Sequence, residues 1–160
     1  MRTFFIAAKS VFFSACFLAL WAWLARGVRA YDHAIGFLLP SWSDWPGAVL
    51  LLVGSVLAFS CVTSFVIRGQ GTPAPFDAPV QFVAVGPYRW VRNPMYIGGW
   101  LMLIGYGFLL RSPAALLFSG VFLLWWHLFV LFYEEPTLRE KFGAEYEEYC
   151  RRVHRWLPTQ

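Results

Sequence analysis

Four runs of apolar residues, each long enough or nearly long enough to cross a lipid bilayer, decide what this chain can fold into. They cover about residues 4–24, 46–67, 94–110 and 113–133. A helix rises about 1.5 Å per residue, so about 20 apolar residues span the hydrocarbon layer, and the third run is short. Of the 160 residues, 59% are hydrophobic and only 14% are charged, which is too little charge for the surface of a soluble domain. We therefore predict one all-α integral membrane domain over residues 1–160, with about four transmembrane helices.

The basic residues predict how these helices are oriented. If the N-terminus lies in the cytoplasm, only Arg26, Arg29 and Arg111 of the 13 basic residues lie outside. This is the bias that the positive-inside rule expects, with both termini cytoplasmic. It puts residues 68–93 and the C-terminal tail on the same membrane face. Because the basic residues flank apolar runs and form no single block, we expect contacts with membrane lipids and no nucleic-acid partner.

The loop before the third run carries the first group of candidate binding residues. Gly69 and Gly71 lie in a glycine- and proline-rich exit from the second run. Asn93 and Pro94 are a typical N-cap and first-turn pair, and the helix end that they begin, next to Arg92, suits an anionic group. Gly98 would leave backbone exposed one turn later, although helix packing alone also explains a glycine there.

Two adjacent carboxylates, Glu134 and Glu135, close the fourth run. Carboxylates at a hydrocarbon boundary are costly unless they are paired or functional, although a solvated helix end is the simpler alternative. A functional pair would suit a cationic group. Pro136 then bends or restarts the helix.

The tail is a separate amphipathic element. Its apolar residues recur every three or four positions, at Leu138, Phe142, Tyr146, Tyr149, Val153 and Trp156. Gly143 is expected to interrupt the helix. Such a tail either lies on the membrane surface or closes over a site formed by the loop and the two glutamates. The three cysteines and three histidines are dispersed without metal-ligand spacing, so we predict no metal site.

Two stretches together resemble a family of membrane enzymes. Residues 86–98 read Gly-Pro-Tyr-Arg-Trp-Val-Arg-Asn-Pro-Met-Tyr-Ile-Gly, and residues 134–158 begin with the glutamate pair and end in Arg-Trp-Leu-Pro. Both are similar to the signatures of the isoprenylcysteine carboxyl methyltransferase and phospholipid methyltransferase families. The asparagine at position 93 is closer to the phospholipid and bacterial branches.

The resemblance implies a site that encloses S-adenosylmethionine and releases S-adenosylhomocysteine. It implies that Phe82 and Val83 wall the adenine and that Arg155 and Trp156 close the pocket. The cofactor-binding residues that it implies are Gly69, Gly71, Phe82, Val83, Tyr88, Arg92, Asn93, Tyr96, Gly98, Glu134 and Glu135.

These patterns predict methyl transfer to a lipid or another membrane-partitioned small molecule at the cytoplasmic face. We expect Glu134, Glu135, Arg92 and Arg155 to carry the chemistry, with either glutamate as the base for an acceptor that must lose a proton. Two alternatives stay open at this point. One is an NADPH-dependent membrane reductase, because sterol reductases have a similar tyrosine-rich tail. The other is a non-catalytic membrane scaffold. The sequence does not indicate an oligomeric state.

Overall fold

The computed structural model describes residues 2–69 and 82–158 of the chain. Within these ranges every regular element is helical, which confirms the all-α prediction. The elements in order are α1 (Arg2–Gly27), η1 (Val28–Tyr31), α2 (Asp32–Ile35), η2 (Ser41–Ser43), α3 (Asp44–Ser64), η3 (Phe65–Gly69), η4 (Gly86–Arg89), α4 (Pro94–Leu109), α5 (Pro113–Phe129), η5 (Val130–Glu134) and α6 (Glu135–Arg152).

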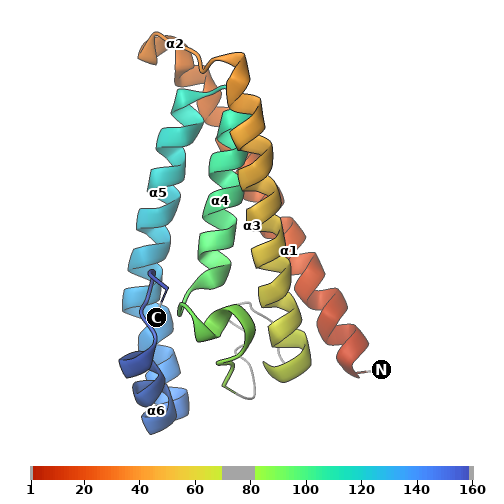
Figure 1. Cartoon of the computed structure of the whole chain (residues 1–160), viewed down its shortest axis with the longest axis vertical. Coiled ribbons are helices and arrows are strands. Elements are labelled where there is room, and N and C mark those ends of the chain that lie inside the picture. The colour runs from red at the N-terminus through yellow and green to blue at the C-terminus, as the bar shows by residue number, and fades with distance from the viewer. Residues whose placement is uncertain (1, 70–81, 159–160) are drawn as a thin grey trace.

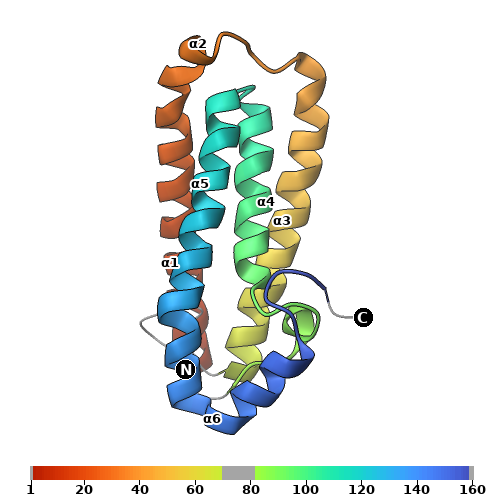
Figure 2. The same cartoon turned by 90° about the vertical axis from the view of Figure 1, so that its left-hand side faces the viewer.

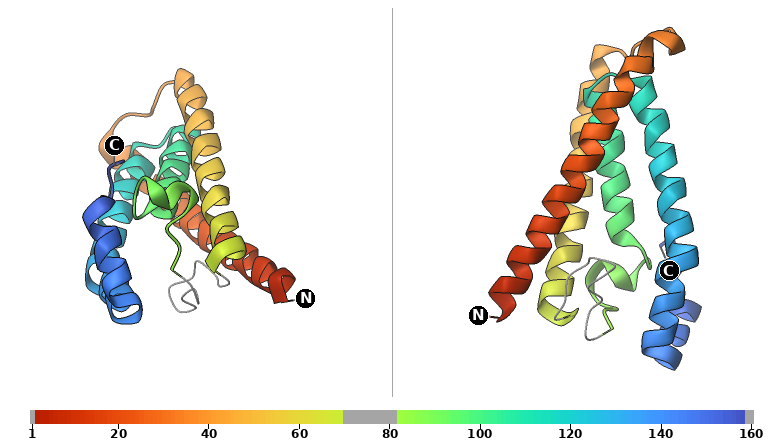
Figure 3. Two further views of the ribbon diagram at one scale, coloured as in Figure 1. Left: turned by 60° about the horizontal axis from the view of Figure 1, so that its bottom comes forward. Right: turned by 180° about the vertical axis from the view of Figure 1, so that it is seen from behind.

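The long helices α1, α3, α4 and α5 run side by side and come together at one end of the molecule (Figure 1). We call this the hairpin end, because the α4–α5 turn lies there, next to α2. At the opposite end, the α6 end, α1 and α5 diverge, and the N-terminus, η4 and α6 lie there (Figure 3). This arrangement puts the predicted loop and tail at the same end of the bundle.

Three helical stretches are long and apolar enough to cross a membrane: Val11–Ile35, Ser41–Ile67 and Pro113–Arg152. Helix α4 is apolar but has only 16 residues, or about 24 Å, which is shorter than a typical hydrocarbon layer. The chain is therefore an integral membrane protein with three full-length spans and a shorter fourth. We place the end of the last span at Glu134, because α6 is rich in charged residues of both signs.

Helices α3 and α4 pack through glycines spaced seven residues apart. Gly47 and Gly54 of α3 face Gly105 and Gly98 of α4. A Cβ atom built on Gly54 would lie 2.6 Å from the carbonyl oxygen of Gly98, so no side chain fits at this crossing. Where lipid already solvates apolar side chains, such close backbone approach is the main way to gain packing energy.

Polar contacts fasten the hairpin end. Arg111, which has a φ of 51°, forms a two-bond ion pair with Asp44 at the start of α3, with 3.0 Å between its Nε and Oδ1. The buried carboxylate of Asp32 accepts bonds from the Ser112 hydroxyl (2.8 Å) and the Ala114 backbone N–H (2.9 Å). Asp32 thus occupies the positive end of α5 and ties it to the segment after α1.

The last span continues into α6 through a π-helical turn, η5. Pro136 lies two residues after this turn and has no N–H to donate. A wide turn before it removes the clash of its ring with the preceding carbonyls. At Gly143 the backbone leaves the helix, with φ 52° and ψ −126°, which confirms the predicted interruption. The second half of α6 then turns back toward the η4 segment (Figure 2).

Candidate functional site

The α6 end joins two segments that are 58 to 62 residues apart in the sequence. The backbone N–H of Arg92 donates to the carbonyl of His154 (2.9 Å). The hydroxyl of Tyr149 in α6 donates to the carbonyl of Tyr88 in η4 (2.7 Å). Burial raises the pKa of Tyr149, so its phenol keeps the proton that this bond needs. The loop before α4 and the C-terminal tail therefore meet, as the sequence predicted.

Asn93 holds the tail to the start of α4 in a way that we did not predict. Pro94 begins α4 as expected, but the side chain of Asn93 does not cap the helix. Its amide Nδ2 donates instead to the carbonyl of Arg155 (3.1 Å). The predicted cap is wrong because the tail presents a carbonyl that the amide can reach. The side chain of Asn93 therefore does not occupy the N–H groups of the first turn of α4.

Glu135 is the centre of a charge cluster. Its carboxylate is 2% exposed and takes two bonds from Arg155, at 2.7 Å from Nε and 3.0 Å from the terminal nitrogen. Arg92 lies 3.0 Å away and Arg139 lies 3.5 Å away. Burial alone would raise the pKa of this carboxyl, but the bond from Arg155 and the charges of the three arginines outweigh it, so the pKa of Glu135 is lowered. Glu135 is therefore ionised and fully engaged with protein groups.

One donor of Arg92 has no partner among the described residues. One terminal nitrogen contacts Glu135 (3.0 Å) and donates to the sulfur of Cys150 (2.9 Å). Its Nε is buried and has no hydrogen-bond partner among residues 2–69 and 82–158. A buried donor without an acceptor is rare in proteins, and it indicates a place for an oxygen of a ligand or water.

Glu134, in contrast, contacts α4. One carboxylate oxygen accepts a hydrogen bond of 2.7 Å from the hydroxyl of Tyr96 in α4. The ring of Tyr96 stacks on Trp126 of α5, with 4.6 Å between ring centroids and 19° between ring planes. The two adjacent glutamates thus have different surroundings: one is bound by cations and the other by a phenol next to an aromatic core.

The remaining predicted residues line the lower part of this region or lie outside it. Val83 and Tyr88 are buried in a cluster with Cys61 of α3. Phe82 packs edge-on against Tyr149, with 5.0 Å between centroids. Gly69 ends η3, and Gly71 lies outside the described residues.

The surroundings of Gly98 support the helix-packing explanation for this glycine. It faces Gly54 and Ala58 of α3, and a Cβ atom built on it would lie 3.0 Å from the Gly54 carbonyl oxygen. The crossing of α3 and α4 therefore accounts for its missing side chain. Tyr96, two residues earlier on α4, faces Glu134 and Trp126 instead.

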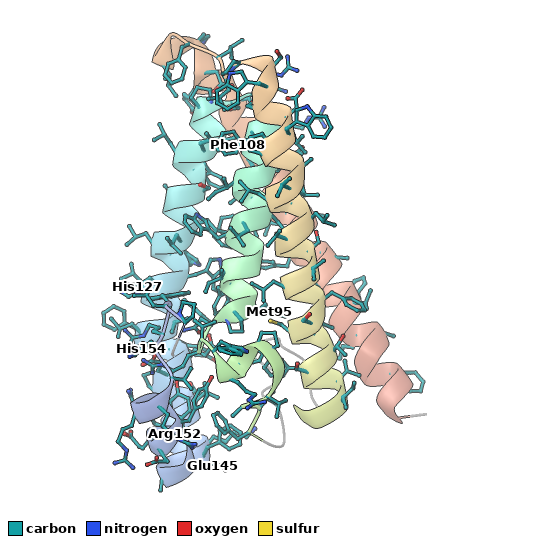
Figure 4. The ribbon with its side chains drawn as sticks, viewed as in Figure 1. Met95, Phe108, His127, Glu145, Arg152 and His154 are labelled. Carbon is teal, nitrogen blue, oxygen red and sulfur yellow. The ribbon has the colours of Figure 1, made fainter. Side chains whose placement is uncertain are left out.

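The tail is also attached to α5. The indole N–H of Trp156 donates to Nδ1 of His127 (3.0 Å), so that ring nitrogen carries no proton in this arrangement. Figure 4 shows His154 of the tail beside the lower part of α5, below His127. Together with the bonds to Arg92 and Asn93, this contact holds residues 154–156 between the start of α4 and the end of α5, where the predicted lid would lie.

Sequence reasoning missed three participants: Arg139 and Cys150 in the charge cluster, and Trp126 behind Tyr96. Arg139 lies one helical turn after Glu135, a spacing that supports ion pairs and could have been noticed. Nothing in the sequence pairs Cys150 with Arg92. Within the described ranges, no group of three or more His, Cys, Asp or Glu side chains is placed to hold a metal ion.

Known proteins share these segments. Residues 42–145 match the phospholipid methyltransferase family. The chain is also similar to two rice proteins, each called a probable protein-S-isoprenylcysteine O-methyltransferase, from Oryza sativa subsp. indica and subsp. japonica. Each is 31% identical over 118 residues, which are 72% of this chain and 61% of the relative. The chain thus matches about three-fifths of the length of these relatives, and the matched family region contains α3, α4, α5 and the first half of α6.

Proposed function

Because the chain belongs to the phospholipid methyltransferase family, we propose that it transfers a methyl group from S-adenosylmethionine to a membrane-partitioned acceptor. The observation that carries this proposal is the division of the α6 end into a cationic part and an anionic part. Arg92 and the uncapped start of α4 form the first, and Glu134 forms the second. A zwitterionic cofactor with a sulfonium needs both.

Two features of the described residues support the cofactor assignment. The buried Nε of Arg92 lacks an acceptor within the described ranges, and a carboxylate oxygen would supply one. The first turn of α4 lacks a side-chain cap, and free N–H groups at a helix start favour an anion. We therefore assign Arg92, Asn93 and the first turn of α4 to the cofactor's carboxylate end, and Glu134 to its cationic groups.

When bound, S-adenosylmethionine supplies a methyl group on a positively charged sulfur. The protein's part is to hold donor and acceptor in line, since positioning of this kind contributes about 7–11 kcal/mol to such reactions. Tyr96 fixes the carboxylate of Glu134 by its hydrogen bond. Glu134 would take the proton from an acceptor that must lose one.

Glu135 has a different part in this proposal. Its contacts to Arg92, Arg139 and Arg155 orient the arginines and bind the tail to the start of α6. We therefore assign Glu135 and Arg155 as positioning residues, which act through Arg92 and through closure of the tail. Phe82, Val83 and Tyr88 would form the apolar wall for the adenine, and Gly69 and Gly71 stay cofactor-binding candidates on the sequence alone.

The acceptor is proposed to be a lipid or another apolar small molecule. Glu134 lies at the end of the last span, and its partner Tyr96 packs on the aromatic core between α4 and α5. An acceptor that reaches Glu134 from that side comes from the bilayer. The reductase and scaffold alternatives are not favoured, because the family and both relatives are methyltransferases by name.

Calorimetry on the protein in detergent tests the cofactor assignment. We expect S-adenosylhomocysteine to bind and NADPH not to bind, and Arg92→Lys and Glu134→Gln each to weaken binding by about tenfold or more. Binding of NADPH in place of S-adenosylhomocysteine would refute the proposal. Incubation of membrane lipid extracts with methyl-labelled cofactor tests the acceptor class, and label found only in water-soluble products would contradict it.

A further inference from the structure

A tryptophan in the aromatic core of the bundle has a hydrogen-bond donor that no described residue accepts. Trp126 of α5 is only 8% exposed, and its indole N–H finds no acceptor in the part of the chain that the structure describes. The same is true of the indole N–H of Trp100 in α4, which packs against the same aromatic cluster. At the depth of the hydrocarbon layer there is no bulk water to bond these groups.

Most buried tryptophans find a partner for the N–H, because burial without one is costly. This chain shows the usual solution elsewhere: the indole of Trp156 donates to His127. Two buried donors left without acceptors in one cluster are therefore unusual, and packing alone does not account for them. An indole can only donate, so the missing group must carry an acceptor atom.

The position of Trp126 connects this donor to the proposed reaction site. Its ring lies flat against Tyr96, and Tyr96 donates to Glu134. Phe17 and Trp21 of α1 also pack against it, with 5.3 Å between the Phe17 and Trp126 centroids. A molecule in contact with Trp126 would thus lie among apolar rings, with its polar end near the Tyr96–Glu134 pair.

We propose that Trp126, assisted by Trp100, binds an oxygen of the methyl acceptor and selects molecules that carry such an oxygen near the reacting group. This rests on the proposed function and names the acceptor class more closely: an apolar molecule with a carbonyl, carboxylate or hydroxyl oxygen at its polar end. A protonated amine has no lone pair for an indole N–H and gains nothing from this site. A pure hydrocarbon gains nothing either.

The indole N–H signals of the protein labelled with ¹⁵N-tryptophan test this directly. The chain has nine tryptophans, and the variants Trp126→Phe, Trp100→Phe and Trp125→Phe assign three of the signals. Trp125 is the matched control, because it is the neighbour of Trp126 but is 60% exposed on the outer face of α5. The protein is placed in nanodiscs of ether-linked phosphatidylcholine, which has no ester carbonyls, and is titrated with 2-tridecanone or with tridecane.

We expect the ketone to move the Trp126 signal downfield, toward the position of the bonded Trp156, while tridecane leaves it in place and Trp125 responds to neither. Ester-linked phosphatidylcholine in place of the ether lipid distinguishes a lipid carbonyl from the added ketone as the source of the oxygen. The proposal is overturned if ketone and alkane act alike, or if Trp126 is already downfield in ether lipid, since water or protein would then hold the donor.

A binding measurement separates this inference from the proposed function. Trp126→Phe should weaken 2-tridecanone binding by about three- to tenfold, and Trp125→Phe should not. Trp125→Phe should bind S-adenosylhomocysteine as the wild type does, and a cooperative thermal unfolding transition shows that both variants fold. If the wild type fails to bind S-adenosylhomocysteine, the proposed function fails while the ketone result stands. If only the ketone effect is missing, this inference alone fails.

Discussion

At the scale of single residues, two neighbours with the same side chain have different tasks. Glu134 and Glu135 follow each other in the sequence, yet a phenol binds the first and three arginines surround the second. Successive residues on a helix point about 100° apart, so a pair at a helix junction can face two elements at once. The sequence predicted a functional pair but not that the two carboxylates face different partners, because their directions depend on the π-helical turn before them.

Replacing Glu135 by glutamine should destabilise the protein more than the same change at Glu134. Removing the anion leaves Arg92, a mostly buried cation, without its partner, and partly exposed Arg155 without its strongest contact. We expect a loss of about 2–3 kcal/mol, below the full cost for a completely buried pair. Thermal unfolding in detergent measures it, with Glu140→Gln on the exposed face of α6 as control. Equal melting temperatures for the variants at 134, 135 and 140 would contradict it.

The lowered pKa of Glu135 predicts a dependence of stability on acid. A carboxyl whose folded pKa lies below its ordinary value of 4.5 adds stability above that value and loses it as the pH falls through the folded pKa. We therefore expect the melting temperature to fall below about pH 4.5, and to fall less steeply in Glu135→Gln. Melting curves from pH 7 to pH 3 test this, and parallel curves for the two proteins would disprove it.

At the scale of elements, the crossing of α3 and α4 depends on side chains that are absent. The seam formed by Gly47, Gly54, Gly98 and Gly105 leaves room only for backbone. The repeat of seven is visible in the sequence, but which face of each helix carries it is not. For that reason the sequence alone did not predict that helix packing explains the glycine at position 98.

Adding one methyl group at this seam should separate the two helices. In Gly54→Ala the new Cβ would meet the Gly98 carbonyl oxygen at 2.6 Å, so α3 or α4 must shift, at a cost of about 1–3 kcal/mol. Gly120→Ala on α5 is the matched control, because a Cβ there has no neighbour within 4 Å. Unfolding in a denaturing detergent mixture compares the two. The packing account is wrong if both variants unfold like the wild type.

At the scale of the whole molecule, different segments hold the hairpin end and the α6 end together. Asp32 and Arg111 join helices at the hairpin end, and the C-terminal tail joins the segments at the α6 end. Much of this was predictable: apolar runs bounded by proline and glycine fixed the helices, and the basic residues placed loop and tail together. The buried role of Asp32 and the partner of Asn93 were not, because each depends on contacts across more than 60 residues.

The tail should be required for cofactor binding but not for insertion. A chain that ends after Arg152 keeps all the spans and loses the contacts of residues 153–156 with Arg92, Asn93, Glu135 and His127. We expect it to enter the membrane and to bind S-adenosylhomocysteine at least tenfold more weakly. A chain that ends after Leu157 is the control. Unchanged affinity in the shorter chain would show that the tail is no lid.

The proposed orientation has its own test. Both termini are expected in the cytoplasm, with the turn at Arg111 outside. Reporter proteins that are active on only one side of the membrane, fused at each terminus or inserted after Arg111, check this. A terminus and the turn reporting the same side would contradict the four-span topology.

The ion cluster at Glu135 also sets the order in which the site is completed during synthesis. Arg92 is made first, Glu135 next, and Arg155 twenty residues after that. Until Arg155 has emerged, the carboxylate lacks its bidentate partner, and the asparagine at the start of α4 lacks the carbonyl that it holds. A nascent chain can therefore have all its spans in the bilayer while the site is still open, so the ability to retain the cofactor arises last.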